Sequence, residues 1–131
     1  MIVDTSAVVA ILLGEAGWEA LANAVLADSD PKMSAATTVE LHAVAGARGG
    51  PAQSRRIDAL LKALRIRIVD FDAEQSGIAR QAYRDFGKGS GHRAKLNLGD
   101  CFSYALAAVA GEPLLFVGED FVHTDLEAVL R

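Results

Sequence analysis

Segments in which apolar residues recur at helical spacing alternate along the chain with short runs that are almost entirely apolar. The helical spacing predicts helices at Ser6–Leu13, Glu15–Ala27, Thr37–Arg48, Ala52–Leu64, Asp72–Phe86 and Gly99–Ala110. The short runs predict strands at Met1–Asp4, Lys32–Ser34, Arg65–Val69 and Leu114–Val117. Strands that alternate with helices favour right-handed crossovers and a parallel sheet. We therefore expect a three-layer α/β domain, in which a central parallel sheet of four to five short strands is flanked by helices.

Length and composition fit one globular domain. The chain has 131 residues, of which 51% are hydrophobic and 23% are charged. We expect a single domain over residues 1–131 with a packed core, because this balance excludes a disordered chain. The only cysteine, Cys101, excludes an internal disulfide and a cysteine-rich zinc site. The apolar run Val8–Leu13 is too short for a signal peptide or a membrane span, so a soluble, cytoplasmic protein is expected.

The net charge of −4 conceals three blocks of different sign. Residues 1–47 carry six acids and one base, residues 48–95 carry five acids and eleven bases, and residues 96–131 carry six acids and one base. A basic middle between two acidic ends indicates a surface on which acids collect cations and bases hold an anion. Solvated helix faces are an alternative explanation of the same pattern.

Four acids occur where the sequence is otherwise most apolar. Asp4 ends the first predicted strand, Glu40 lies in a helix with little else that is polar, and Asp100 begins the most apolar helix. Asp120 follows the last predicted strand by three residues. Because the carboxyl ends of parallel strands meet at one edge of a sheet, Asp4 and Asp120 are expected at the same edge.

Each of these acids also has an ordinary structural explanation. Asp4 is a suitable N-cap for the helix that follows it, and Asp100 would favourably meet the positive end of its own helix. Glu40 could be a hydrogen-bonded core acid or face solvent, and Asp120 could belong to a turn. These explanations are independent of one another, whereas a single metal site accounts for all four acids.

Electrostatics indicates what such a cluster would bind. Two carboxylates 5 Å apart repel each other by roughly 3 kcal/mol at an effective dielectric constant of 20. Four of them stay ionised together only if cations lie between them. Ligands that are all oxygen favour Mg²⁺ or Mn²⁺ over zinc, and carboxylates that hold such ions are well suited to phosphodiester hydrolysis.

Three sequence motifs at characteristic positions resemble those of PIN-domain ribonucleases. They are Asp4-Thr5-Ser6 at the start, Leu96-Asn97-Leu98-Gly99-Asp100-Cys101, and Gly118-Glu119-Asp120-Phe121 followed by Thr124-Asp125, with Glu40 in an early helix between the first two. More narrowly, the whole chain resembles a VapC toxin of a bacterial type II toxin–antitoxin pair. The resemblance implies a PIN-like fold and a Mg²⁺- or Mn²⁺-dependent endoribonuclease that restrains translation and growth.

The resemblance also assigns residues. It matches Asp4, Glu40 and Asp100 to the metal-binding acids, Asp120 to a more variable fourth catalytic acid, and Ser6 to a supporting hydroxyl. Two positions depart from the usual pattern. Leu98 replaces a common phenylalanine, which affects packing only. Glu119 replaces a common Asn or Asp, so the fourth acid is either Asp120 or, as second choice, Asp125.

Partners follow from the resemblance and from the surface chemistry. The family implies an RNA substrate with an exposed loop, such as tRNA, a cognate VapB-like antitoxin and a homodimeric toxin. Phosphate contacts are expected from basic residues of the central block: Arg80, Arg84, Lys88, Arg93 and Lys95.

The predicted helices Glu15–Ala27 and Ala52–Leu64 have long apolar faces, which predict a surface for the antitoxin. The residues expected to contact it are Trp18, Leu21, Leu60 and Leu61. An antitoxin arginine would neutralise the acids.

Two other functions remain alternatives. A catalytically silent module could chelate metal through the same acids. A receiver-like phosphoacceptor domain could use Asp70 after the third predicted strand, but Thr5 stands where that class needs a second acid, and no lysine follows Leu114–Val117.

His42 lies about 200° from Glu40 around its helix, so it is not expected to share a ligand set with that acid.

Overall fold

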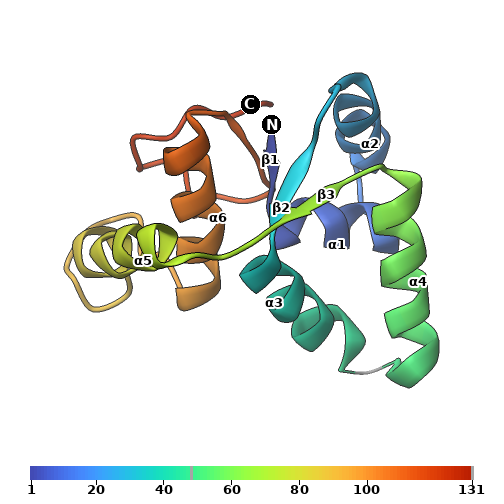
Figure 1. Ribbon diagram of the computed structural model, residues 1–131, viewed down its shortest axis with the longest axis horizontal. Coiled ribbons are helices and arrows are strands. Elements are labelled where there is room, and N and C mark those ends of the chain that lie inside the picture. The colour runs from blue at the N-terminus through green and yellow to red at the C-terminus, as the bar shows by residue number, and fades with distance from the viewer. Residues whose placement is uncertain (48, 131) are drawn as a thin grey trace.

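The computed structural model describes residues 1–47 and 49–130, and it contains a parallel sheet between layers of helices (Figure 1). The elements in chain order are β1 (Ile2–Val3), α1 (Thr5–Leu13), α2 (Trp18–Ala27), β2 (Lys32–Ser34), α3 (Ala35–Gly46), α4 (Gly50–Ala63), β3 (Arg67–Val69), α5 (Ala73–Phe86), α6 (Leu98–Ala110) and β4 (Leu114–Leu115). The strand order is β3-β2-β1-β4, and all neighbouring pairs are parallel. The predicted α/β architecture with four strands is confirmed.

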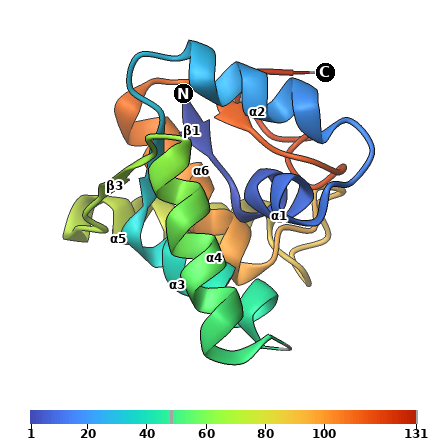
Figure 2. The same cartoon turned by 90° about the vertical axis from the view of Figure 1, so that its right-hand side faces the viewer.

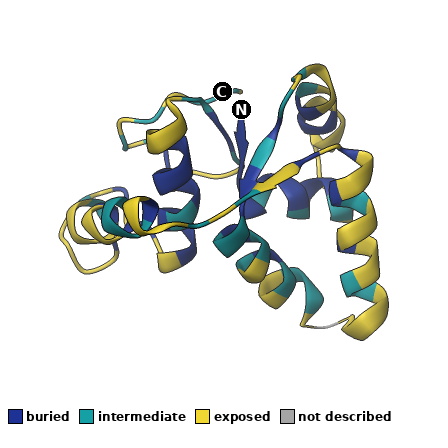
Figure 3. Cartoon of the chain, in the orientation of Figure 1, coloured by how far each residue is buried: buried dark blue, intermediate teal, exposed yellow. Residues whose placement is uncertain are grey.

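The two faces of the sheet build two apolar cores. Val3, Leu41 and Ile57 belong to the core that joins β1 to α1, α2, α3 and α4. Ile2 and Leu106 belong to the core beneath α5 and α6. Neighbouring residues of β1 therefore point to opposite faces, as the pleat of a strand requires. Figures 1 and 2 show the corresponding layers. Figure 3 shows buried residues concentrated on β1, β2 and the inward sides of the helices, whereas the edge strand β3 is largely exposed.

Polar side chains define where several helices begin. The side chains of Asp4, Ser34 and Asp72 accept backbone N–H groups at the starts of α1, α3 and α5. Asn97 and Asp100 form a reciprocal capping box at the start of α6. Because β1 leads directly into α1 and β2 into α3, the beginnings of these helices meet at the carboxyl edge of the sheet.

Some predicted boundaries are wrong for local reasons. The helix expected from Glu15 begins at Trp18, because Gly17 has a left-handed backbone (φ 86°) that a helix cannot contain. The helix expected from Ala52 already begins at Gly50, since Pro51 occupies its first turn, where a missing N–H costs nothing. The helix expected over 37–48 is α3, which begins two residues earlier; its expected last residue, Arg48, lies outside the described residues.

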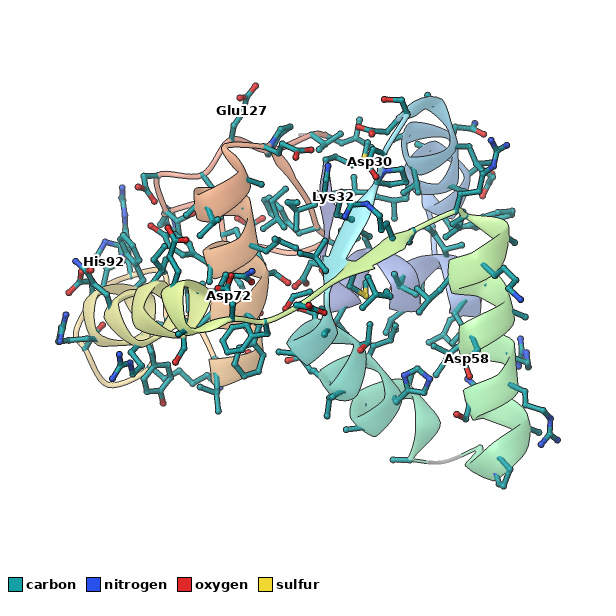
Figure 4. All side chains as sticks on the ribbon, in the orientation of Figure 1. Asp30, Lys32, Asp58, Asp72, His92 and Glu127 are labelled. Atoms are coloured by element: carbon teal, nitrogen blue, oxygen red, sulfur yellow. The ribbon has the colours of Figure 1, made fainter. Side chains whose placement is uncertain are left out.

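An ion-pair network joins the elements at the amino edge of the sheet. The Lys32 ammonium lies 2.8 Å from Oε2 of Glu112 and 3.1 Å from Oδ2 of Asp30, and Arg67 pairs with the same Asp30 oxygen at 2.9 Å. Figure 4 shows Asp30 and Lys32 near each other beside β2. These two cations are therefore occupied in holding strands together at the edge opposite the predicted acid cluster.

Burial corrects part of the expected antitoxin surface. Leu21 and Leu61 are buried in the core shared by α1, α2, α3 and α4, so they already pack against this chain and offer no free surface. Leu60 is half-buried against the same core, whereas Trp18 is 38% exposed. Helical spacing identifies an apolar face, but it does not reveal whether this chain or a partner covers it. Among the described residues, no helix is long and apolar enough to cross a membrane.

Candidate active site

The carboxyl edge of the sheet contains a pocket of about 310 Å³ that brings the four expected acids together. Asp4 and Asp120 follow β1 and β4, Glu40 comes from α3, and Asp100 comes from the first turn of α6. The complete lining is Asp4, Thr5, Ser6, Val9, Glu15, Glu40, Val44, Asn97, Asp100, Val117 and Asp120. These lining residues include acids from five separate parts of the sequence and no basic side chain.

Hydroxyl groups hold the carboxylate of Asp4, which is only 3% exposed. Ser6 donates to Oδ2 of Asp4 through its backbone N–H (3.0 Å) and its hydroxyl (2.7 Å), and Ser103 donates to Oδ1 (2.6 Å). The Ser6 hydroxyl in turn accepts the backbone N–H of Val117 from the loop after β4 (3.0 Å). Asp4 is therefore both the N-cap of α1 and a fixed wall of the pocket.

Glu40 is held between α1 and α6. The Thr5 hydroxyl donates to Oε1 of Glu40 at 2.5 Å. On its other side the carboxylate lies against the backbone of Gly99. Burial raises the pKa of Glu40, the hydrogen bond from Thr5 opposes this shift, and the charge of Asp4 adds to it.

Asp100 is the acid of the pocket whose pKa is raised furthest from its ordinary value. Its Oδ2 accepts the backbone N–H of Asn97 at 2.9 Å, which completes the capping box of α6. The pKa of Asp100 is raised to about 7, chiefly by burial and further by the charges of Asp4, Asp120 and Glu40, while the hydrogen bond from Asn97 opposes the shift. The capping explanation of Asp100 is thus confirmed, and the same residue also lines the acidic pocket.

The loop after β4 separates the two candidates for the fourth acid. Asp120 is exposed and lines the pocket. Asp125 instead accepts a hydrogen bond from the hydroxyl of Tyr104 at 2.7 Å, and it is not among the residues that line the pocket. Position therefore favours Asp120, while Asp125 fastens the C-terminal segment to α6.

The residues present fit a hard divalent cation, but their side chains are not yet arranged around one. Within residues 1–47 and 49–130, no three acidic, histidine or cysteine side chains stand close enough together to enclose an ion. Asp4, Glu40 and Asp100 are each held by hydrogen bonds within the chain, so ion binding requires small movements of their carboxylates. Carboxylate-only ligands and mutually raised acid pKa values are what a pocket for an oxygen-seeking cation should show.

The other sequence candidates lie outside this pocket. His42 contacts the Thr38 carbonyl through Nδ1 and Asp58 through Nε2, both at 2.9 Å, so it joins α3 to α4. It does not line the acidic pocket, in agreement with its position on the helix away from Glu40. The five basic candidates are exposed on α5 and on the segment that leads to α6: Arg80, Arg84, Lys88, Arg93 and Lys95. Lys95 lies two residues before Asn97 on the pocket wall.

Sequence reasoning missed five residues of the site. Thr5 and Ser103 hold acids that are 35 and 99 residues away, and Asn97 caps the helix that carries Asp100. Gly99 makes room for Glu40, and Glu15 adds a fifth acid to the lining. One signal was available for Ser103, because it lies three residues after Asp100 and so shares its helix face.

The fold and the pocket together describe a parallel α/β domain whose acids gather at the carboxyl edge of its sheet. The model of the PIN domain family matches residues 1–127. Ribonuclease VapC42 of Mycobacterium tuberculosis is 54% identical over 96% of each chain, and Ribonuclease VapC of Mycolicibacterium smegmatis is 50% identical over 98% of this chain and 99% of its own. This chain belongs to the PIN-domain family and, within it, to the VapC ribonucleases.

Solved structures agree with the fold. The structure of VapBC2 from Rickettsia felis bound to a DNA fragment superposes with a TM-score of 0.74 at 15% identity and covers 97% of this chain and 95% of that one. A likeness at such low identity shows that the arrangement of elements is shared although most side chains differ.

The raised pKa of Asp100 predicts how the metal-free protein responds to pH. A carboxyl group whose folded pKa lies above its unfolded pKa stabilises the fold below the unfolded value, and this contribution is lost as the pH rises through the folded value. We expect the melting temperature in EDTA to fall between about pH 4 and pH 8. Asp100→Asn should reduce that fall and melt higher than the parent at pH 8.

Calorimetry of both proteins in EDTA measures this effect, with Glu127→Gln as the control. Glu127 is exposed and points away from the fold beside the start of β4 (Figure 4). An Asp100→Asn protein whose melting temperature follows the same pH curve as the parent would contradict the raised pKa of Asp100 in this pocket.

Proposed function

We propose that this VapC ribonuclease hydrolyses RNA phosphodiester bonds at the pocket lined by Asp4, Glu40, Asp100 and Asp120. Convergence of these four acids in one pocket is the observation that carries the proposal. Nucleases of the PIN family depend on metal ions in general. As a VapC ribonuclease, the chain is the toxin of a type II toxin–antitoxin pair, and its activity would restrain translation and growth.

Mg²⁺ is the proposed cofactor, for which Mn²⁺ can substitute. Asp4, Glu40 and Asp100 would hold it, since all three offer only oxygen ligands and line one pocket. The raised pKa values of Glu40 and Asp100 indicate that a positive charge would be favourable there. When bound, such an ion lowers the pKa of the attacking water and neutralises charge on the scissile phosphate. Asp120, on the exposed side of the pocket, is the proposed fourth catalytic acid.

The chain's own hydroxyl and amide groups prepare these acids. Ser6 donates two hydrogen bonds to Oδ2 of Asp4 and Ser103 donates one to Oδ1, so Oδ1 keeps a lone pair for a cation. Thr5 donates one hydrogen bond to Glu40 and Asn97 donates one to Asp100, which leaves lone pairs on those carboxylates as well. Partners that orient ligands in this way reduce the motion that must be lost when a ligand binds.

RNA needs a positive surface, because the acidic pocket alone repels phosphates. The exposed bases between Arg80 and Lys95 supply it, and they approach the pocket along the segment that ends at Asn97. A single strand or a loop, as in tRNA, suits a shallow site better than a duplex, since its bases can be splayed apart.

The antitoxin surface is proposed beside the pocket. An apolar groove of about 510 Å³ is lined by Val9, Leu13, Val44, Ala45, Gly49 and Gln53. Leu13 and Val44 are 60% and 62% exposed, and Val9 and Val44 also line the acidic pocket. A VapB-like antitoxin helix could therefore cover the groove while one of its arginines reaches the acids. Trp18 does not line this groove and is proposed as a further antitoxin contact outside it.

The toxin is also proposed to form a homodimer. Val39 and Leu98 are 70% and 61% exposed, and they precede Glu40 and Gly99, which touch each other. Large apolar side chains that are exposed to this degree favour burial against a second protein. Light scattering of the antitoxin-free protein tests this proposal, and a monomeric mass at micromolar concentration would contradict it.

The alternative functions now have less support. A receiver-like domain is a different family, and Asp70 lies outside the acidic pocket. A catalytically silent PIN module differs from the proposal only in activity, so cleavage of RNA distinguishes the two.

The central prediction is metal-dependent cleavage that requires the acids. Purified protein should cleave RNA with Mg²⁺ or Mn²⁺ and not in EDTA. Asp4→Ala, Glu40→Ala and Asp100→Ala should each reduce kcat/KM by at least about 100-fold, because removal of one ligand displaces the reacting groups. Asp125→Asn is the matched control and should retain activity. An Asp100→Ala protein that still cleaves with the same metal dependence would refute the site.

A second prediction concerns the basic residues. The double variant Arg93→Gln/Lys95→Gln should bind RNA more weakly and reduce the slope of log K against log salt by about 1.4, as expected for two lost phosphate contacts on a single strand. Binding is measured in Ca²⁺ or EDTA over a range of salt concentrations. Arg55→Gln/Arg56→Gln on α4 removes the same charge elsewhere and serves as the control. An equal slope in the parent and the first variant would exclude this surface.

A third prediction concerns the antitoxin groove. Val44→Asp should weaken antitoxin binding about 10- to 100-fold, since an exposed contact near the centre of an apolar interface is worth about 1–3 kcal/mol. Its melting temperature should change little, because Val44 is already exposed. Val109→Asp, on the exposed side of α6, is the control. If Val44→Asp binds as tightly as the parent, the antitoxin helix lies elsewhere.

A further inference from the structure

The position of the Glu40 carboxylate depends on the absence of a side chain at Gly99. A Cβ atom added to Gly99 would overlap Oε2 and the carboxylate carbon of Glu40, and it would lie 2.9 Å from Oε1. Van der Waals contact requires more than 3 Å, so the carboxylate and a side chain at position 99 cannot occupy this space together.

The backbone gives no other reason for a glycine at this position. Gly99 is the second residue of α6, and it is not among the residues with positive φ. Alanine is the better helix former, and it would fit the backbone without strain. The glycine is therefore explained by space for Glu40, whereas Gly14 and Gly111 end their helices with left-handed backbones.

Two contacts from different elements thus determine where the Glu40 carboxylate lies. The hydroxyl of Thr5, at the start of α1, donates a hydrogen bond to Oε1. The first turn of α6 has no side chain at Gly99 and therefore leaves space for Oε2. The turn that admits Glu40 also carries Asp100, the next residue along the chain. The spacing between these two acids is therefore set by how closely Glu40 approaches α6. The amino-terminal end of that helix favours a nearby negative charge.

We propose that Gly99 is a positioning residue for the reaction. Its missing side chain lets Glu40 approach the first turn of α6 and so sets the distance between the carboxylates of Glu40 and Asp100. This inference rests on the proposed function, because the distance matters only if both acids hold the same cation. Gly99 itself touches neither RNA nor the reacting atoms.

Gly99→Ala tests the inference. The protein should fold, because alanine suits the helix, and its melting temperature in EDTA should stay at or above that of the parent. It should bind Mn²⁺ alone at least about tenfold more weakly in calorimetric titration and lose about 100-fold in kcat with little change in KM for RNA. Gly77→Ala on α5 is the matched control, since a Cβ there meets only Arg80 Nη2 at 3.9 Å.

Shortening the acid at position 40 should partly restore the Mn²⁺ affinity and the kcat of the Gly99→Ala protein. Glu40→Asp withdraws the carboxylate by one methylene group, so it should lower Mn²⁺ affinity and kcat when position 99 is glycine. In the Gly99→Ala background the same change relieves the overlap, and it should raise both quantities at least about threefold above Gly99→Ala alone. A general loss of packing would not produce this reversal of sign.

The outcomes separate the inference from the proposed function. If the parent protein cleaves RNA and Gly99→Ala matches it in Mn²⁺ affinity and kcat, the positioning role is wrong while the proposed function stands. Failure of Glu40→Asp to improve the Gly99→Ala protein would also overturn the role. If the parent neither binds Mn²⁺ nor cleaves RNA, the proposed function itself fails.

Discussion

Burial of several carboxylates close together at one edge of the sheet is the constraint on which the rest of the structure depends. Asp4 and Asp100 are almost fully buried, Glu40 and Asp120 line the same pocket, and no basic side chain is among its described lining residues. Isolated buried charges of this kind would destabilise a small domain. The chain offsets part of the cost with neutral hydrogen-bond donors that orient the acids and leave their charge available for a cation.

The same polar residues serve the fold and the site. Asp4 begins α1, and Asp100 belongs to the capping box of α6, so these acids stabilise helices before any ligand binds. The parallel sheet then brings both helix starts to one edge, together with α3 and the loop after β4. Structural and functional explanations of an acid are therefore not exclusive here. A helix N-terminus attracts a carboxylate, and several such termini at one edge gather carboxylates in one pocket.

Sequence patterns were informative where the decisive neighbours are close along the chain. The strand Lys32–Ser34 and the helix that begins near Asp100 follow from local apolar spacing, and the order of strands and helices predicts the parallel sheet. Local spacing did not reveal that Leu21 and Leu61 are covered by their own domain. The positions of Thr5, Ser103 and Gly99 beside acids far away in sequence depend on packing that no short pattern encodes. The four acids and the supporting hydroxyl of Ser6 could be predicted, but the other groups that hold the acids could not.

Four acids from distant parts of the chain are proposed to form one cation site. Anomalous diffraction from crystals of the protein grown with Mn²⁺ would locate that ion. We expect a strong anomalous peak within coordination distance of Asp4 and Asp100, with Glu40 or Asp120 turned toward it. A peak bound only by residues outside this pocket, or none at millimolar Mn²⁺, would contradict this proposal.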